Sequence, residues 1–213
     1  FDIIKEHFSG VGTVLFVPYA LKDHDAYEAK AAAAFEAMGL KLVSIHHAED
    51  PRAAVHAAEG IFIGGGNTWR LLARLYKLDL VSAIQEAVLT RGIPYMGSSA
   101  GTNVATRSIR TTNDMPIVPV PTLDALQLVP FQINPHYMDP EPGSTHKGET
   151  REERLMQYLE ENTVPVVGLR EGSTLRVVED TVELLGTLPA RMFSVEKSPF
   201  EVEPGARLDH LLK

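Results

Sequence analysis

The sequence predicts an α/β fold, a doubly wound and mostly parallel sheet with helices on both faces. Along the first hundred residues, short apolar runs that end at Gly or Pro alternate with longer helical stretches. Such runs are typical of strands buried on both faces. A strand–helix–strand order favours parallel pairing through right-handed crossovers. In such a sheet, functional sites lie at the carboxyl ends of the strands.

The first half of the chain supplies these elements in order. Residues 12–17 form the first apolar run, and residues 25–38 form an Ala- and Glu-rich helix that ends at Gly39. Asp50 followed by Pro51 is typical of an N-cap with proline at the first helical position. The other elements predicted here are strands at 40–45, 61–63 and 93–96 and helices at 51–58, 68–76, 80–90 and 102–105.

After residue 106 the alternation of strand and helix signals becomes less regular. Residues 111–121 are rich in turns and proline, and residues 138–148 form a loop long enough to act as a lid. The elements predicted here are a strand at 126–133, a charged helix at 149–161, a buried strand at 164–169, a hairpin of 175–178 and 182–185, and an edge strand at 193–195. The sequence shows no repeat or domain boundary, so we expect one domain over residues 1–213.

Composition narrows the possible functions. The 213 residues are 44% hydrophobic and 23% charged, as expected for a soluble globular domain. A net charge of −8 without a Lys/Arg run argues against nucleic-acid binding. The absence of cysteine excludes a thiolate nucleophile and thiolate metal ligands. Without a membrane-length apolar run or a signal-like start, we expect a cytoplasmic monomer or homodimer that does not contact a membrane.

The stretch GSSAG, residues 97–101, has the G-x-S-x-G pattern of a nucleophile elbow between a strand and a helix. Ser99 is the central serine. Glycines allow a sharp turn that projects this side chain over the edge of the sheet, and the N–H of Ala100 at the helix N-terminus can stabilise an oxyanion. The alternative interpretation is an ordinary Gly/Ser turn or an N-cap.

A serine nucleophile needs a base, and His136 is the favoured candidate. It follows the strand that ends at Pro135, so it reaches the same carboxyl edge as Ser99. His146, in the predicted lid, is the competitor. For the remaining six histidines a solvated or packing role is expected: His7, His24, His46, His47, His56 and His210.

Two carboxylates can complete a triad by orienting the imidazole. Glu171 follows the buried strand at 164–169, whereas Asp114 lies in a proline-bounded loop. We favour Glu171 because the strand gives it a rigid platform. A turn or cap role is the alternative for each acid.

A second strand–turn–helix junction, IGGGNT at 63–68, carries three glycines. It lacks the G-x-G-x-x-G pattern and the P-loop lysine, so a nucleotide site is disfavoured. Gly66 can instead place its N–H opposite that of Ala100 as a second oxyanion donor.

These motifs together resemble peptidase E, a family of α-aspartyl dipeptidases. The resemblance extends over nearly the whole chain and is strongest in IGGGNTWRLL (63–72), GSSAGTN (97–103), IRTTNDMPIV (109–118), QINPH (132–136) and HKGETRE (146–152). It implies a flavodoxin-like sheet related to class I glutamine amidotransferases. It also implies a serine dipeptidase whose small peptide substrates are dipeptides with N-terminal aspartate, and no cofactor or metal. Ser99 is then the nucleophile, His136 the base, and Glu171 or Asp114 the acid.

The sequence departs from the family at two places. Ser98 stands where the family often has an aromatic residue, and an N-terminal strand and loop of the family are not found ahead of residues 12–17. Aspartate specificity also requires a cation. Arg151, at the start of a charged helix, is the first candidate for a bidentate pair with the substrate carboxylate, and Arg110 is the second. A surface ion pair with neighbouring glutamates is the alternative role for Arg151.

Two other functions stay open at this point. A cyanophycinase-like exopeptidase would act on β-aspartyl-arginine units and would need acidic groups to receive the arginine. A non-catalytic module for small anions would use the glycine turns without a triad.

Overall fold

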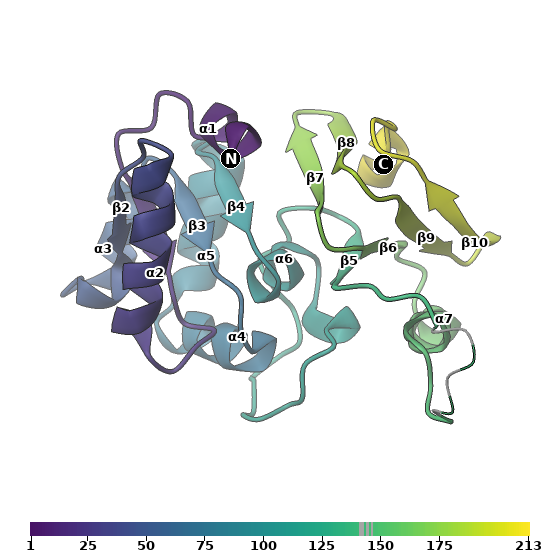
Figure 1. Ribbon diagram of the computed structural model, residues 1–213. Helices are drawn as coiled ribbons and strands as arrows, with labels where there is room; N and C mark the ends of the chain where they lie inside the picture. Colours follow the sequence, from purple (N-terminus) through teal and green to yellow (C-terminus); the bar gives the residue numbers. More distant parts are fainter. Residues whose placement is uncertain (141–142, 144, 146) are drawn as a thin grey trace.

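The computed structural model describes the whole chain except residues 141, 142, 144 and 146 (Figure 1). The strands are β1 (Val14–Val17), β2 (Leu42–Ser44), β3 (Ile61–Ile63), β4 (Tyr95–Gly97), β5 (Gln132–Pro135), β6 (Val166–Leu169), β7 (Ser173–Val178), β8 (Thr181–Gly186), β9 (Ala190–Ser194) and β10 (Lys197–Val202). The α-helices are α1 (Asp2–His7), α2 (His24–Ala37), α3 (Pro51–Ala57), α4 (Thr68–Lys77), α5 (Leu80–Gln85), α6 (Ala100–Ala105) and α7 (Arg151–Glu161). Shorter helical segments are η1 (Ile45–His47), η2 (Glu86–Thr90), η3 (Ile109–Thr111) and η4 (Asp209–Leu212).

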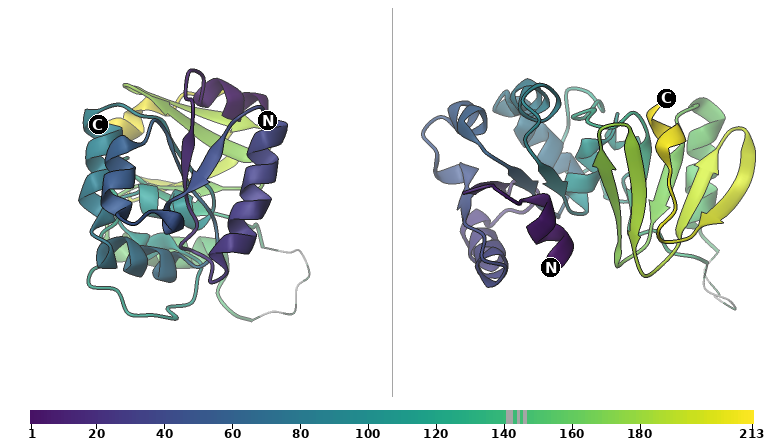
Figure 2. Two further views of the ribbon diagram at one scale, coloured as in Figure 1. Left: turned by 90° about the vertical axis from the view of Figure 1, so that its left-hand side faces the viewer. Right: turned by 90° about the horizontal axis from the view of Figure 1, so that it is seen from above.

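The first half forms a parallel sheet with the order β2-β1-β3-β4. Side chains alternate along β1: Leu15 and Val17 belong to the core that includes residues of α4, α5 and α6, whereas Val14 and Phe16 belong to the core that includes residues of α2. Helices therefore cover both faces of this sheet (Figures 1 and 2), as the continuous apolar runs predict.

The second half forms a mixed sheet with the order β10-β9-β6-β5, in which β5 and β6 are parallel and the other pairs are antiparallel. Its two faces are covered differently. Ile133, Val167 and Met192 pack with residues of the β7–β8 hairpin and of the C-terminal segment. Val166 and Phe193 pack with residues of α7, which lies beside this sheet in Figure 1. The carboxyl ends of β5 and β6 thus lie beside each other on a rigid platform.

Three elements in this half differ from the sequence prediction. The strand predicted at 193–195 as an edge is β9, which lies between β6 and β10. The strand predicted at 126–133 is formed only as β5, because Leu126 N–H donates to the carbonyl of Val104 at the end of α6, at 2.8 Å. The edge strand β10 was not predicted because Pro199 interrupts it, and the pairing with β9 shifts register there. No helix in the part of the chain that the structure describes is long and apolar enough to cross a lipid bilayer.

Candidate active site

Ser99 lies at the turn between β4 and α6 and holds a backbone φ of 52°, which residues with a side chain rarely adopt. Its carbonyl already accepts from Asn103 N–H, at 3.0 Å, so the helix begins directly behind it. Such a strained backbone persists only where the surroundings impose it. The predicted elbow geometry is therefore present at Ser99.

The glycines beside Ser99 are required by backbone contacts. A Cβ on Gly97 would lie 2.5 Å from the carbonyl oxygen of Gly101, and a Cβ on Gly101 would lie 2.1 Å from that of Ile63. Both distances are far below van der Waals contact. Only glycine at these two positions lets α6 pack tightly against β3 and β4 and lets the turn between them close.

His136 directly follows β5, as predicted, and its Nε2 lies 2.8 Å from the Oγ of Ser99. Its own φ is 56°. The neighbouring backbone is held on both sides: Asn113 Nδ2 donates to the carbonyl of Pro135 at 2.8 Å, and Tyr137 N–H donates to that of Leu169 at 3.1 Å.

Glu171 meets the other side of the imidazole, where its carboxylate forms a hydrogen bond with Nδ1 of His136. The register of the two strands explains this contact. Pro135 pairs with Leu169 in the parallel β5–β6 ladder, and both strands end there. Because an ionised carboxylate can only accept, Nδ1 carries the proton and Nε2 accepts from the hydroxyl of Ser99. The structure thus brings together a serine, a base and an acid in the order that nucleophilic catalysis needs.

Asp114, the other candidate acid, lies beside the start of α4. Its carboxylate accepts from the backbone N–H and the hydroxyl of Thr68, at 2.7 and 2.6 Å, at the first residue of α4. The carboxylate that contacts His136 is that of Glu171. Asp114 is therefore bonded from a separate loop to the first residue of α4, whose N-cap is Asn67, and among the described residues it has no hydrogen bond to His136. The contact to His136 favours Glu171 as the acid.

The competing base cannot be compared, because His146 lies outside the described residues. Of the other histidines, His46 and His47 contact carboxylates on α2, and His7 Nε2 bonds to the carbonyl of Tyr95. None of the described histidines other than His136 has a hydrogen bond to Ser99.

Of the two predicted oxyanion donors, Ala100 lies directly beside the nucleophile. Ala100 is the first residue of α6, so its N–H has no acceptor within the helix. The loop after β3 also comes close, but at Gly65: a Cβ there would lie 3.0 Å from the Cβ of Ser99 and 3.6 Å from its Oγ. Gly66 instead packs on Ala20, whose carbonyl would lie 2.6 Å from a Cβ at position 66. The role of the Gly66 N–H stays a prediction, and Gly65 is the neighbour that the sequence alone did not single out.

Both candidate specificity arginines line one small pocket of about 50 Å³. Its described lining contains arginines but no carboxylate, and consists of Arg110, Thr111, Thr112, Asn113, Asn134, Arg151, Arg154, Leu155 and Tyr158. Burial, and then repulsion by the charge of Arg154, lowers the pKa of Arg151. Asn134, two residues before His136, has a buried Oδ1 with no partner among the described residues. This pocket is suited to an anionic ligand.

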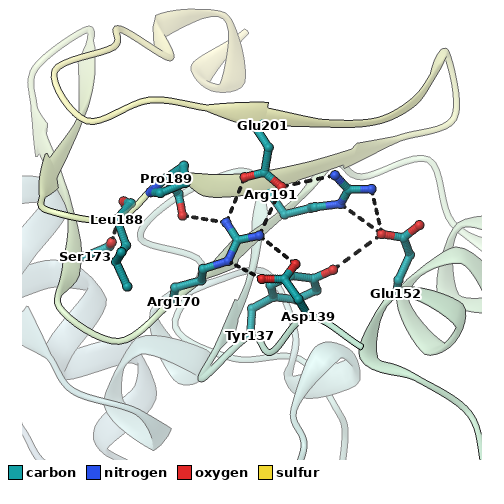
Figure 3. Close-up of polar contacts among 9 residues, drawn as sticks. All are labelled: Tyr137, Asp139, Glu152, Arg170, Ser173, Leu188, Pro189, Arg191 and Glu201. Atoms are coloured by element: carbon teal, nitrogen blue, oxygen red, sulfur yellow. Dashed lines mark hydrogen bonds and ion pairs between the residues drawn. The ribbon is translucent and has the colours of Figure 1, made fainter. Parts of the chain in front are cut away.

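Behind the acid lies an ion-pair network that sequence reasoning missed (Figure 3). Arg170, next to Glu171 and with only 13% of its side chain exposed, donates to both carboxylate oxygens of Asp139 and of Glu201 and to the carbonyl of Pro189. Its guanidinium lowers the pKa values of the Asp139 and Glu201 carboxyl groups.

The network continues from Glu201 to Arg191 on β9, whose guanidinium bonds to Glu152 on α7 (Figure 3). The hydroxyl of Tyr137 donates to the same Glu152 carboxylate at 3.4 Å, and burial raises the pKa of Tyr137 to about 12. This network of hydrogen bonds and ion pairs therefore joins Tyr137 and Asp139, which follow His136, to Arg170, which precedes Glu171. The only signal in the sequence was the position of Arg170 beside the predicted acid.

Comparison with known proteins agrees with this geometry. Residues 1–185 match the model of Peptidase family S51. The chain is 55% identical over 211 residues to Peptidase E of Streptomyces coelicolor, which covers 99% of this chain and 86% of that protein. It is 52% identical over 212 residues to the "Probable alpha-aspartyl dipeptidase" of Drosophila melanogaster, which covers 100% of this chain and 88% of that protein.

The fold is also found among solved structures. A crystal structure of a peptidase from an acI-B1 Actinobacterium superposes with a TM-score of 0.68 at 15% identity, over 97% of this chain and 88% of that one. The predicted α/β fold and the resemblance to peptidase E are thus confirmed. The chain belongs to peptidase family S51.

Proposed function

We propose that this protein is a serine dipeptidase that hydrolyses dipeptides with N-terminal aspartate. The observation that carries the proposal is the continuous hydrogen-bonded set from Ser99 through His136 to Glu171 at the carboxyl edge of the strands. The names of the relatives in Streptomyces and Drosophila support the substrate class. The arginine-lined pocket supports the preference for an acidic side chain.

The chemistry follows from the positions of the protons. His136 removes the hydroxyl proton as the Oγ of Ser99 attacks the peptide carbonyl, and the Ala100 N–H at the start of α6 stabilises the developing oxyanion. The imidazolium, held by Glu171, then protonates the leaving amine. Water attacks the acyl-enzyme with His136 again acting as base, which releases aspartate and restores the serine.

The alternatives receive less support. A cyanophycinase-like enzyme needs acidic groups to receive arginine, whereas the described lining of the pocket holds Arg110, Arg151 and Arg154. A passive anion-binding module does not need the hydrogen bonds between Ser99, His136 and Glu171. The cytoplasmic location and the monomeric or homodimeric state stay predictions, to be tested by cell fractionation and by analytical ultracentrifugation.

A hydrolysis profile over X-Leu dipeptides tests the proposal. We expect Asp-Leu to be the preferred substrate, Ser99→Ala to abolish turnover, and Ser98→Ala to retain most of it, because position 99 alone holds the elbow conformation. His136→Ala should lose about as much as Ser99→Ala, and the double variant little more, since nucleophile and base act as a unit. Full activity of Ser99→Ala would refute the mechanism, and preference for a β-Asp-Arg dipeptide would refute the substrate class.

A further inference from the structure

A second group of histidine and carboxylate side chains lies outside the candidate active site. Asp25 lies in the first turn of α2 and Glu28 directly after it, and His46 and His47 lie in η1, directly after the edge strand β2. One ligand atom from each of the four side chains can be chosen so that all four lie within 4.8 Å of one another. In Figure 1, α2 and β2 lie side by side, which brings these two segments together.

The four groups face one another in pairs. His46 Nε2 lies 2.9 Å from Asp25 Oδ1, and His47 Nε2 lies 2.6 Å from Glu28 Oε2. His47 Nε2 is also 4.0 Å from Asp25 Oδ1. Four ligands at zinc-bond lengths around one tetrahedral ion stand about 3.4 Å apart. Shifts of about an ångström or less bring these atoms to that spacing.

Ser44, which is not a member of the group, orients two of its members. Its hydroxyl lies 2.6 Å from Nδ1 of His46, and its backbone N–H donates to Oε1 of Glu28 at 3.2 Å. These contacts use one polar atom of each side chain and leave Nε2 of His46 and Oε2 of Glu28 in contact with the other members of the group. Metal-binding histidines and carboxylates are typically held in this way by an outer partner.

Burial also suits an ion site. The side chains of His46 and Glu28 are only 12% and 22% exposed, whereas those of His47 and Asp25 are 59% and 84% exposed. Two ligands are therefore held in place by the protein, and the other two can close over an ion that enters from solvent.

We propose that Asp25, Glu28, His46 and His47 bind one Zn²⁺ or a similar divalent transition metal. Two imidazoles with two carboxylates suit zinc, whereas Mg²⁺ and Ca²⁺ prefer all-oxygen sites. Without metal, the same side chains form two histidine–carboxylate pairs. Binding replaces those contacts and requires both Nε2 atoms to be unprotonated, so the ion competes with protons.

The site ties the start of α2 to the segment after β2. The residues ahead of α2 continue toward the glycine loop, where the carbonyl of Ala20 accepts from Asn67 N–H at 3.0 Å. The ion is thus a structural clamp at an exposed sheet edge, and hydrolysis through Ser99 does not depend on it. The proposal is independent of the proposed function.

Calorimetric titration of the chelator-treated protein with ZnCl₂, and separately with MgCl₂, tests the site. We expect one Zn²⁺ per chain and no Mg²⁺ binding. The midpoint of thermal unfolding should rise by about 5–10 °C when free Zn²⁺ exceeds the dissociation constant 100-fold. CoCl₂ should give the intense visible absorption of a tetrahedral site.

Variants locate the ion. His47→Ala and the conservative Asp25→Asn change exposed side chains, so both should fold and hydrolyse dipeptides in the absence of metal as the wild type does, yet bind Zn²⁺ far more weakly. Ser44→Ala should weaken binding about 10- to 100-fold, as loss of an outer partner does. His56→Ala, which changes an exposed histidine on α3, is the matched control and should bind normally.

The candidate active site also pairs a histidine with a carboxylate, so His136→Ala is titrated in parallel. It should keep the Zn²⁺ site. Loss of binding in His136→Ala with retention in His47→Ala would place the ion at the active site and overturn the proposal. Equal affinity of wild type and His47→Ala, equal weakening by His56→Ala, or no binding by the wild type would overturn it too.

Discussion

Ser99 and His136 both hold backbone conformations with positive φ, and both stand one or two residues beyond a strand. Such conformations cost about 1–3 kcal/mol each. Here they turn the two side chains toward each other across the gap between β4 and β5. The roles of the acid and of the specificity arginine can likewise be tested by single substitutions.

Replacing Glu171 by Gln should lower kcat while leaving KM nearly unchanged, because the uncharged amide no longer stabilises the imidazolium. The Glu171 side chain is 78% exposed, so solvent screens its charge. We expect a loss of about 10- to 1,000-fold, smaller than for a buried triad acid. Steady-state kinetics with Asp-Leu measure it.

The matched control is Asp114→Asn. It should keep kcat within a few-fold and lower the free energy of unfolding by about 1 kcal/mol, because it weakens the hydrogen bonds to Thr68. A larger fall in kcat for Asp114→Asn than for Glu171→Gln would reverse the assignment of the acid.

Arg151→Met should remove most of the preference for Asp-Leu over Asn-Leu. The two substrates have nearly the same shape, but only the carboxylate forms a charge-assisted pair with the half-buried guanidinium in the arginine pocket. The expected loss of discrimination is about 100- to 1,000-fold in kcat/KM. Lys should substitute poorly, because it lacks the bidentate fork.

Labelling by a serine-directed phosphonate serves as the check, and it should persist in Arg151→Met. An unchanged Asp-over-Asn ratio would move the role to Arg110. Loss of labelling would mean that Arg151 supports the fold rather than specificity.

At the scale of elements, Arg170 joins the loop after β5 to β10, directly before the acid (Figure 3). Arg170→Gln should lower kcat about 10- to 100-fold by releasing Glu171 and the segment after His136. It should also lower the free energy of unfolding by about 2 kcal/mol, less than a fully buried network costs because the partners are partly exposed.

Arg191→Gln is the comparison, because it breaks the same network at Glu152 and Glu201 without touching the neighbours of Glu171. It should destabilise the protein by a similar amount and leave kcat nearly unchanged. Equal effects of the two variants on kcat would reduce Arg170 to a purely structural role.

The elements that the sequence predicted well are those decided by local signals. Asp50 caps α3 and Pro51 opens it, as their order predicts. Ser99, His136 and Glu171 were found because parallel strands deliver their next residues to one edge. The ion pairs of Arg170 with Asp139 and Glu201 and the Asp25–His46 pair join residues 21 or 31 positions apart, and no local pattern encodes which charges meet. Pro199 and the charged residues of β10 hid an edge strand for the same reason, since pairing with β9 rather than propensity forms it.

At the scale of the whole molecule, the candidate triad combines residues from the two sheets and so spans the boundary between them. Ser99 comes from the all-parallel sheet, and His136 and Glu171 come from the mixed one, while β4 and β5 are not hydrogen-bonded neighbours. The boundary is polar. Asn134 Nδ2 donates to the carbonyl of Thr111 and Thr111 Oγ1 donates to that of Ile133, so the segment around η3 is joined to β5 by buried hydrogen bonds.

Gln132 is the residue on which this boundary most depends. Its side chain is fully buried, its Nε2 donates to the carbonyl of Ser108 at 2.8 Å, and its Oε1 accepts from the N–H of the same residue at 3.2 Å. Gln132→Met preserves length and volume but leaves the N–H of Ser108 buried and unpaired, whereas the carbonyl of Ser108 keeps the hydroxyl of Thr106 as a donor at 3.0 Å. An unpaired buried group costs about 1–3 kcal/mol, so we expect the free energy of unfolding to fall by about that amount in urea denaturation.

Activity should fall as well, because loosening β5 moves His136 relative to Ser99. Under conditions where Gln132→Met is fully folded, kcat for Asp-Leu should drop about 10- to 100-fold, since even a displacement of about 1 Å between reacting groups has such an effect. Gln157→Met, at an exposed position on α7, should change stability by less than about 0.5 kcal/mol and leave kcat intact. If Gln132→Met were as stable and active as Gln157→Met, the two sheets would be aligned by apolar packing of α6 against β5, and the polar boundary would have no part in holding the triad together.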